Sequence, residues 1–93
     1  MNTASSKLDN LSAIARRIDP TNRRKIVEEE LRPALDDLRS EWDKFDMDHQ
    51  SFSNQVDTLG GWATQIWKKK DGHITAGKFI AELFKLETRL KKK

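Results

Sequence analysis

The hydrophobic positions of this chain recur at intervals of three and four residues, which predicts helices. Between residues 31 and 66 the interval alternates regularly between four and three, the heptad pattern of packed helices. We call this pattern the heptad seam; it consists of Leu31, Leu35, Leu38, Trp42, Phe45, His49, Phe52, Val56, Leu59, Ala63 and Ile66. No segment alternates with the period of two that a half-buried strand requires. The predicted fold class is therefore all-α, a small bundle of three to four helices.

Capping and helix-breaking residues divide the pattern into helices. Ser5 or Ser6 is suited to begin the first helix, with Ser6 as a capping serine, and Asp19-Pro20 ends it and begins the second. Pro33 follows a poor capping residue, so we read it as a kink in a continuing helix. Thr75 is suited to cap the last helix, with Ile74 packing on Phe79 as a hydrophobic staple. The predicted helices span residues 6–18, 20–46, 51–70 and 76–91.

Two arrangements of the heptad seam fit the sequence. In one, a turn between Asp46 and Ser53 folds the seam back on itself, with Asp48 or Ser51 capping a new helix. In the other, one long helix continues through His49, as the unbroken phase of the pattern suggests. We adopt the turn, because a small domain needs compactness. In either arrangement Trp42 is expected in the core, and the seam also allows a homodimer.

Composition indicates one small helical domain with a thin core. The chain has 93 residues, of which 35% are hydrophobic and 35% charged, whereas globular domains average roughly 45–50% and 25%. We expect residues 1–93 to form a single domain, with residues 1–5 and 92–93 flexible. The sequence contains no cysteine, no secretory signal and no long apolar run. A cytoplasmic protein without membrane association is the expectation.

Charge is distributed in three blocks along the chain. Residues 1–25 carry a net charge of +4, residues 28–57 carry −7, and residues 58–93 carry +6. Ten acidic groups in the middle block are unusual in a chain whose net charge is +3. Charge on an exposed helix face usually serves solvation alone, but such segregation also suits a partner that is chosen electrostatically.

Catalytic and metal-binding chemistry is poorly provided for. With two histidines and no cysteine, pairs of a nucleophile and a base are almost unavailable, so we do not expect an enzyme. The cluster of Asp46, Asp48 and His49 lacks a second pair of ligands. Residues 71–75 resemble the second half of an EF-hand calcium loop, but Trp67 and Lys78 would stand at ligand positions. No metal and no cofactor is expected.

Two groups of residues are candidates for binding a protein partner. Trp62 and Trp67 stand beside a run of three lysines, and a tryptophan among lysines is common on binding surfaces, although it also suits the corner between two helices. The second group lies in the acidic block. The full candidate set is Trp62, Trp67, Lys68, Lys69, Lys70, Asp36, Asp37, Glu41 and Asp43.

Basic runs near the helix ends offer an alternative, binding to nucleic acid. The candidates are Arg16, Arg17, Arg23, Arg24 and Lys25. Such residues neutralise phosphates, but near helix ends they also stabilise the helices themselves. No element carries the bracketed polar side chains of a recognition helix, so such binding would be directed at the backbone.

Taken together, these features predict a non-enzymatic protein-binding module, an adaptor or inhibitor that docks on a larger complex, one that handles nucleic acid being an option. Small, charged, cysteine-free helical chains of this kind are similar to accessory and inhibitor proteins of phages and other mobile elements. Two alternatives stay open at this stage. One is a nucleic-acid-binding regulator that uses basic helix ends, and the other is a structural coiled-coil subunit, dimeric through the heptad seam.

Overall fold

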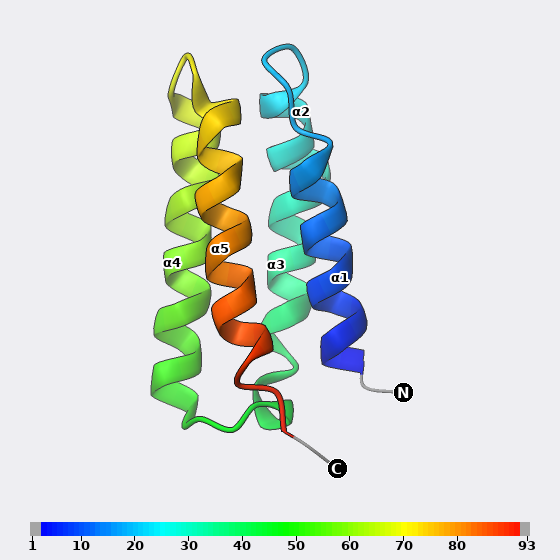
Figure 1. Ribbon diagram of the computed structural model, residues 1–93, viewed down its shortest axis with the longest axis vertical. Coiled ribbons are helices and arrows are strands. Elements are labelled where there is room, and N and C mark those ends of the chain that lie inside the picture. The colour runs from blue at the N-terminus through cyan, green and yellow to red at the C-terminus, as the bar shows by residue number, and fades with distance from the viewer. Residues whose placement is uncertain (1–2, 92–93) are drawn as a thin grey trace.

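Residues 3–91, the part of the chain that the computed structural model describes, fold as an all-α bundle, as the sequence predicts. Four helical rods run alternately up and down (Figure 1). The elements are α1 (Thr3–Arg16), a second rod made of α2 (Arg23–Ile26), the π-helical η1 (Val27–Leu31) and α3 (Arg32–Arg39), then the 3-10 turn η2 (Trp42–Lys44), α4 (His49–Lys68), the 3-10 turn η3 (Gly72–Thr75) and α5 (Ala76–Glu87). The α1 and α4 rods lie at opposite corners, and each packs on both α3 and α5.

The second rod continues past Pro33, which confirms the predicted continuing helix. Immediately before the proline the backbone widens into η1, where the N–H of Arg32 donates to the carbonyl of Val27, five residues earlier. A proline ring collides with the carbonyl four residues before it, and a widened turn is one way to make room. The rod ends at Arg39, however, seven residues before the predicted end at residue 46.

The chain reverses between Ser40 and Asp48, so the prediction of a turn is confirmed and the long-helix arrangement is wrong. The Asp48 carboxylate caps α4 by accepting from the N–H of Ser51 at 2.6 Å. The turn is tied to the C-terminal segment, since the Asp46 N–H donates to the Arg89 carbonyl at 2.5 Å and the Lys91 N–H to the Lys44 carbonyl at 3.0 Å.

Two seam positions in this reversal do not face the core. Trp42 is 45% exposed, which makes the prediction of a core tryptophan wrong. Its ring meets the exposed His49 ring edge-on, with the centroids 5.2 Å apart. The unbroken heptad phase across the turn is therefore a coincidence of spacing.

The remaining nine seam positions are buried in the core of their own chain. Leu38, for example, is completely buried between α3 and its neighbours. A homodimer through the seam, as the coiled-coil alternative requires, is therefore inconsistent with this bundle. All four rods contribute to the same core; its largest fully buried side chains are Phe45, Phe52, Phe79, Leu11, Leu31, Leu38, Leu59, Ile66, Leu86, Val27 and Val56.

Three helix starts differ from the prediction. The second rod begins at Arg23 after the N-cap Asn22, not at Pro20 after Asp19, and α4 begins at His49, not at residue 51. The first helix begins at Thr3, not near Ser6, and Ala4 is fully buried. The predicted flexibility of residues 3–5 stays a prediction. Residues 1–2 and 92–93, the rest of that prediction, lie outside the described residues. At the last helix Thr75 is the N-cap as predicted, but its side chain makes no capping hydrogen bond. Ile74 is 68% exposed, so the predicted staple on Phe79 is wrong.

Gly72 is required by the close approach of the turn after α4 to the end of that helix. A Cβ atom at this position would lie 2.0 Å from the carbonyl oxygen of Ile66. We expect Gly72→Ala to lower the free energy of unfolding by about 1–3 kcal/mol, because backbone must move. The matched control is Gly60→Ala in α4, where a Cβ meets nothing within 4 Å.

The control should raise the free energy of unfolding by about 0.5–1 kcal/mol, since alanine loses less backbone entropy in a helix. Urea unfolding followed by circular dichroism measures both variants. Equal effects of the two substitutions would contradict the packing of this turn.

The cap at Asp48 makes the stability of the fold depend on pH. Hydrogen bonds from the backbone and side chain of Ser51 hold the pKa of Asp48 below its ordinary value. In the unfolded chain the pKa of an aspartate is about 3.9, and above that pH the charged Asp48 contributes its full stabilisation to the fold. The stabilisation is lost as the pH falls through the lower pKa of Asp48 in the folded state.

We therefore expect Asp48→Ala to lower the melting temperature by a few degrees at neutral pH, and the gap to wild type to shrink below about pH 4. Asp36→Ala removes an exposed carboxylate that caps no helix and serves as the control for charge. A gap for Asp48→Ala that stays constant down to about pH 2 would show that the carboxylate does not act as a charged cap.

Candidate functional site

Side chains of the second rod close the C-terminus of α4. The Arg23 guanidinium donates to the carbonyl of Ile66 at 3.0 Å and also to that of Trp67. The indole N–H of Trp67 donates to the Glu28 carboxylate at 3.0 Å, and the Arg24 guanidinium lies 4.8 Å from the centroid of the Trp67 ring. Carbonyls at a helix end have no partner within the helix, so these contacts satisfy them and pin α2 to α4.

Most of the arginines predicted to bind nucleic acid have partners within the chain. Arg23 and Arg24 hold the end of α4, and Arg17 forms an ion pair with Glu30 at 2.5 Å. The hydrogen bond and the charge of Glu30 raise the pKa of Arg17. Lys25 is exposed, and Arg16 lies at the mouth of a groove described below.

The predicted partner-binding residues do not form one surface. Trp62, Trp67 and Lys68 to Lys70 lie on the last turns of α4 and just after it, whereas Asp36, Asp37 and Asp43 lie near the opposite end of the bundle (Figure 1). The molecule is 41 Å long on its longest axis. Glu41, also at the acidic end, is partly buried and pairs with Lys7 at 3.2 Å.

The two tryptophans of α4 are only partly exposed. Trp67 is held by α2, so it closes a helix junction. Trp62 is covered from one side by Lys78 of α5, whose Nζ lies 5.3 Å from the ring centroid. Both rings also pack against the core.

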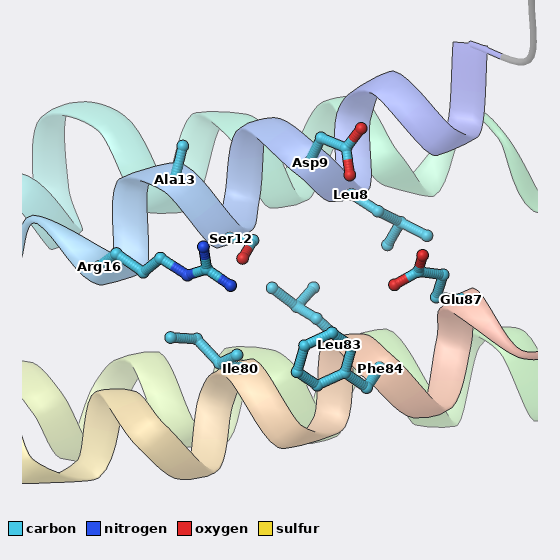
Figure 2. A pocket seen from close by; sticks show the side chains of 9 residues that line it. All are labelled: Leu8, Asp9, Ser12, Ala13, Arg16, Ile80, Leu83, Phe84 and Glu87. Carbon is cyan, nitrogen blue, oxygen red and sulfur yellow. The ribbon is translucent and has the colours of Figure 1, made fainter.

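A groove of about 330 Å³ runs between α1 and α5 (Figure 2). Buried Leu8 and Leu83 line it, together with partly buried Ile80. On the α5 side stands Phe84, which is 53% exposed. The α1 side carries the small Ser12 and Ala13, so one wall is low and the other bears a large aromatic ring.

The charges of the groove are separated along its length. Arg16 lies at one end, and Asp9 and Glu87 lie at the other (Figure 2). Among residues 3–91 none of these three side chains forms an ion pair. An object lying in the groove therefore meets a positive charge at one end and negative charges at the other.

The reasoning from sequence did not single out this groove, although a signal for it exists. Phe79, Leu83 and Leu86 fill the core face of α5, and Ile80 and Phe84 widen that face beyond what the core covers. An apolar face wider than about 100° on a short surface helix indicates a second contact. The other half of the groove, on α1, has no such signal, because its lining residues apart from the buried Leu8 are small or polar.

Other kinds of site find little support in the described part of the chain. No group of three or more histidine, aspartate or glutamate side chains in residues 3–91 is placed to share a metal ion. No helix among these residues has the length and apolar character needed to cross a bilayer. No family model, curated protein or solved structure matches this chain.

The role of Arg23 at the helix junction is testable. We expect Arg23→Ala to lower the free energy of unfolding by about 1–2 kcal/mol, because it removes the charged donor of the Ile66 carbonyl and one of the two charged donors of the Trp67 carbonyl. Lys25→Ala, two residues on and exposed, is the control and should change stability by less than about 0.5 kcal/mol. Chemical unfolding measures both, and equal effects would contradict a specific junction.

Proposed function

We propose that this chain is a non-enzymatic protein-binding module, an adaptor or inhibitor that holds an amphipathic helix of a larger partner in the groove between α1 and α5. The observation that carries the proposal is Phe84, a large aromatic ring more than half exposed beside a groove that Leu8 and Leu83 also line. Aromatic residues of this kind dominate binding energy at protein interfaces.

The shape of the groove suits a helix. Its two walls are antiparallel helices, and the lining residues recur at helical spacing: 9, 12, 13 and 16 on α1, and 80, 83, 84 and 87 on α5. An apolar stripe laid between two such walls packs as a fifth helix of the bundle. Covering the exposed half of Phe84 contributes about 1–2 kcal/mol.

The charges at the two ends would orient the partner. Arg16 attracts an acidic residue, and Asp9 with Glu87 attracts a basic residue on the following turns of the bound helix. A helix inserted in the reverse direction would place like charges together. Electrostatics of this kind selects orientation and partner more than it adds affinity.

The proposal also includes two broader expectations. One is that the partner is a larger complex, and the other is that this chain is of the same kind as accessory proteins of phages and mobile elements. They rest on the small size, high charge and missing cysteine of the chain. The buried heptad seam argues against the structural coiled-coil subunit, because the seam is used inside the bundle.

The groove is tested by capture of partners from the lysate of the native cells after nuclease treatment, using the wild-type chain and two variants. Phe84→Asp places a charge in the groove and should reduce recovery of the specific partner by about tenfold or more. Ile74→Asp is the matched control, since Ile74 is 68% exposed and lies outside the groove.

Both variants should keep the wild-type melting temperature within a few degrees, because each changes an exposed side chain. Equal recovery with wild type and Phe84→Asp would show that the groove is not the binding surface. Equal loss in both variants would show non-specific adhesion of exposed apolar groups.

A further inference from the structure

The fold gathers basic residues from two distant parts of the sequence at one end of the bundle. Arg24 stacks on Trp67, so the residues that follow each of them, Lys25 and Lys68, belong to neighbouring segments. Lys69 and Lys70 continue in the turn after α4. We call Lys25, Lys68, Lys69 and Lys70 the basic end.

The four lysines of the basic end have no charged partner. All are exposed, and none forms an ion pair or a side-chain hydrogen bond with residues 3–91. The acidic groups close to them in sequence are Glu28 and Glu29 in η1 and Asp71 after the lysine run. Glu28 already accepts the indole N–H of Trp67.

Helix stabilisation explains only part of this cluster. Lys68 lies in the last turn of α4, where a positive charge complements the helix dipole. Lys69 is the C-cap residue of α4 and Lys70 follows it, so both also lie near the negative end of that dipole, whereas Lys25 lies in the first turn of a different rod, where the dipole disfavours a positive charge. The helix dipole therefore does not account for Lys25, or for its place beside the lysines that follow α4.

We propose that the basic end binds the phosphate backbone of nucleic acid. The surface lies at the end of the rods, away from the middle of the groove between α1 and α5, so the proposal goes beyond protein binding and does not depend on it. Four unpaired ammonium groups on neighbouring segments match a polymer with one charge per phosphate. No side chains suited to reading bases accompany them, so the contact is independent of sequence.

The acidic groups at the far end would orient the complex. Asp36 and Asp37 in the second half of α3 and Asp43 in η2 are exposed and repel phosphates, although Lys44, Arg89 and Lys91 lie in the same region. The four lysines of the basic end lie together at one end of the 41 Å molecule, so nucleic acid would contact the bundle there. The groove stays free in that arrangement, so one molecule can hold a protein helix and a nucleic acid together.

The test is fluorescence anisotropy with the full chain and three probes: a labelled 20-base-pair DNA duplex, a labelled 20-nucleotide RNA, and vesicles containing anionic lipid. Binding through about four lysines should give a slope of log affinity against log salt of about −3 to −4 for the duplex, a loss of roughly 100-fold between about 50 and 200 mM salt. Comparing the affinities for the RNA and the DNA probe identifies the preferred polymer.

The decisive variant combines Lys68→Ala, Lys69→Ala and Lys70→Ala, and should reduce the slope by about three and affinity at low salt by about tenfold or more. The matched control combines Lys44→Ala, Lys85→Ala and Lys91→Ala, which removes the same charge from the other half of the molecule. The control should stay within about threefold of wild type.

Circular dichroism shows whether each variant is folded. If the decisive variant loses helix, the pair Lys69→Glu and Lys70→Glu replaces it, since both positions follow α4. Three results would overturn the proposal: no binding of either polymer at low salt, equal losses in the two triple variants, or binding to the vesicles alone. Phe84→Asp should leave nucleic-acid binding unchanged. A failure of the nucleic-acid proposal can therefore be told apart from a failure of the proposal that the groove binds a protein.

Discussion

The reversal of the chain between Ser40 and Asp48 is the constraint on which the rest of the structure depends. It converts the heptad seam, which extends over residues 31–66, into two facing helices that bury their apolar side chains against each other. The Asp48 carboxylate holds the start of α4, and the C-terminal segment clamps the turn through the pairing of Phe45 with Leu90. Without this reversal α3 and α4 would not lie side by side, and α1 and α5 could not pack against them to complete the core.

The same reversal separates the charges in space. Because the second rod and α4 are antiparallel, the acidic residues after the middle of the second rod come to one end and the lysines after α4 come to the other. The junction of Arg23 and Arg24 with Trp67 then joins a basic segment from each rod. The separation is partial, because Glu28 lies beside Trp67 at the basic end and Lys91 lies beside Lys44 at the other. Two candidate surfaces, groove and basic end, are available at the same time.

The junction also shows how one set of residues can be both structural and basic. The guanidinium of Arg23 donates to carbonyls at the end of α4, so it is not available to a ligand. The side chains of the exposed lysines of the basic end have no hydrogen-bond or ion-pair partner among residues 3–91. A charge run in a sequence therefore divides, in the structure, into residues that hold the fold and residues that remain available. Burial and hydrogen bonding decide which is which.

The sequence by itself determined the all-α class, the continuing helix through Pro33 and the start of α5 after Thr75, and it narrowed the cap of α4 to Asp48 or Ser51. These depend on local spacing, proline geometry and capping chemistry, which act within a few residues. It did not determine that Trp42 is exposed, that Ile74 stands free of Phe79, or that the second rod ends at Arg39, because each depends on what the rest of the chain covers. Only the tertiary structure decided the groove between α1 and α5 and the grouping of Lys25 with Lys68. Both bring together residues more than 40 positions apart, and helical periodicity carries no information on contacts at that separation.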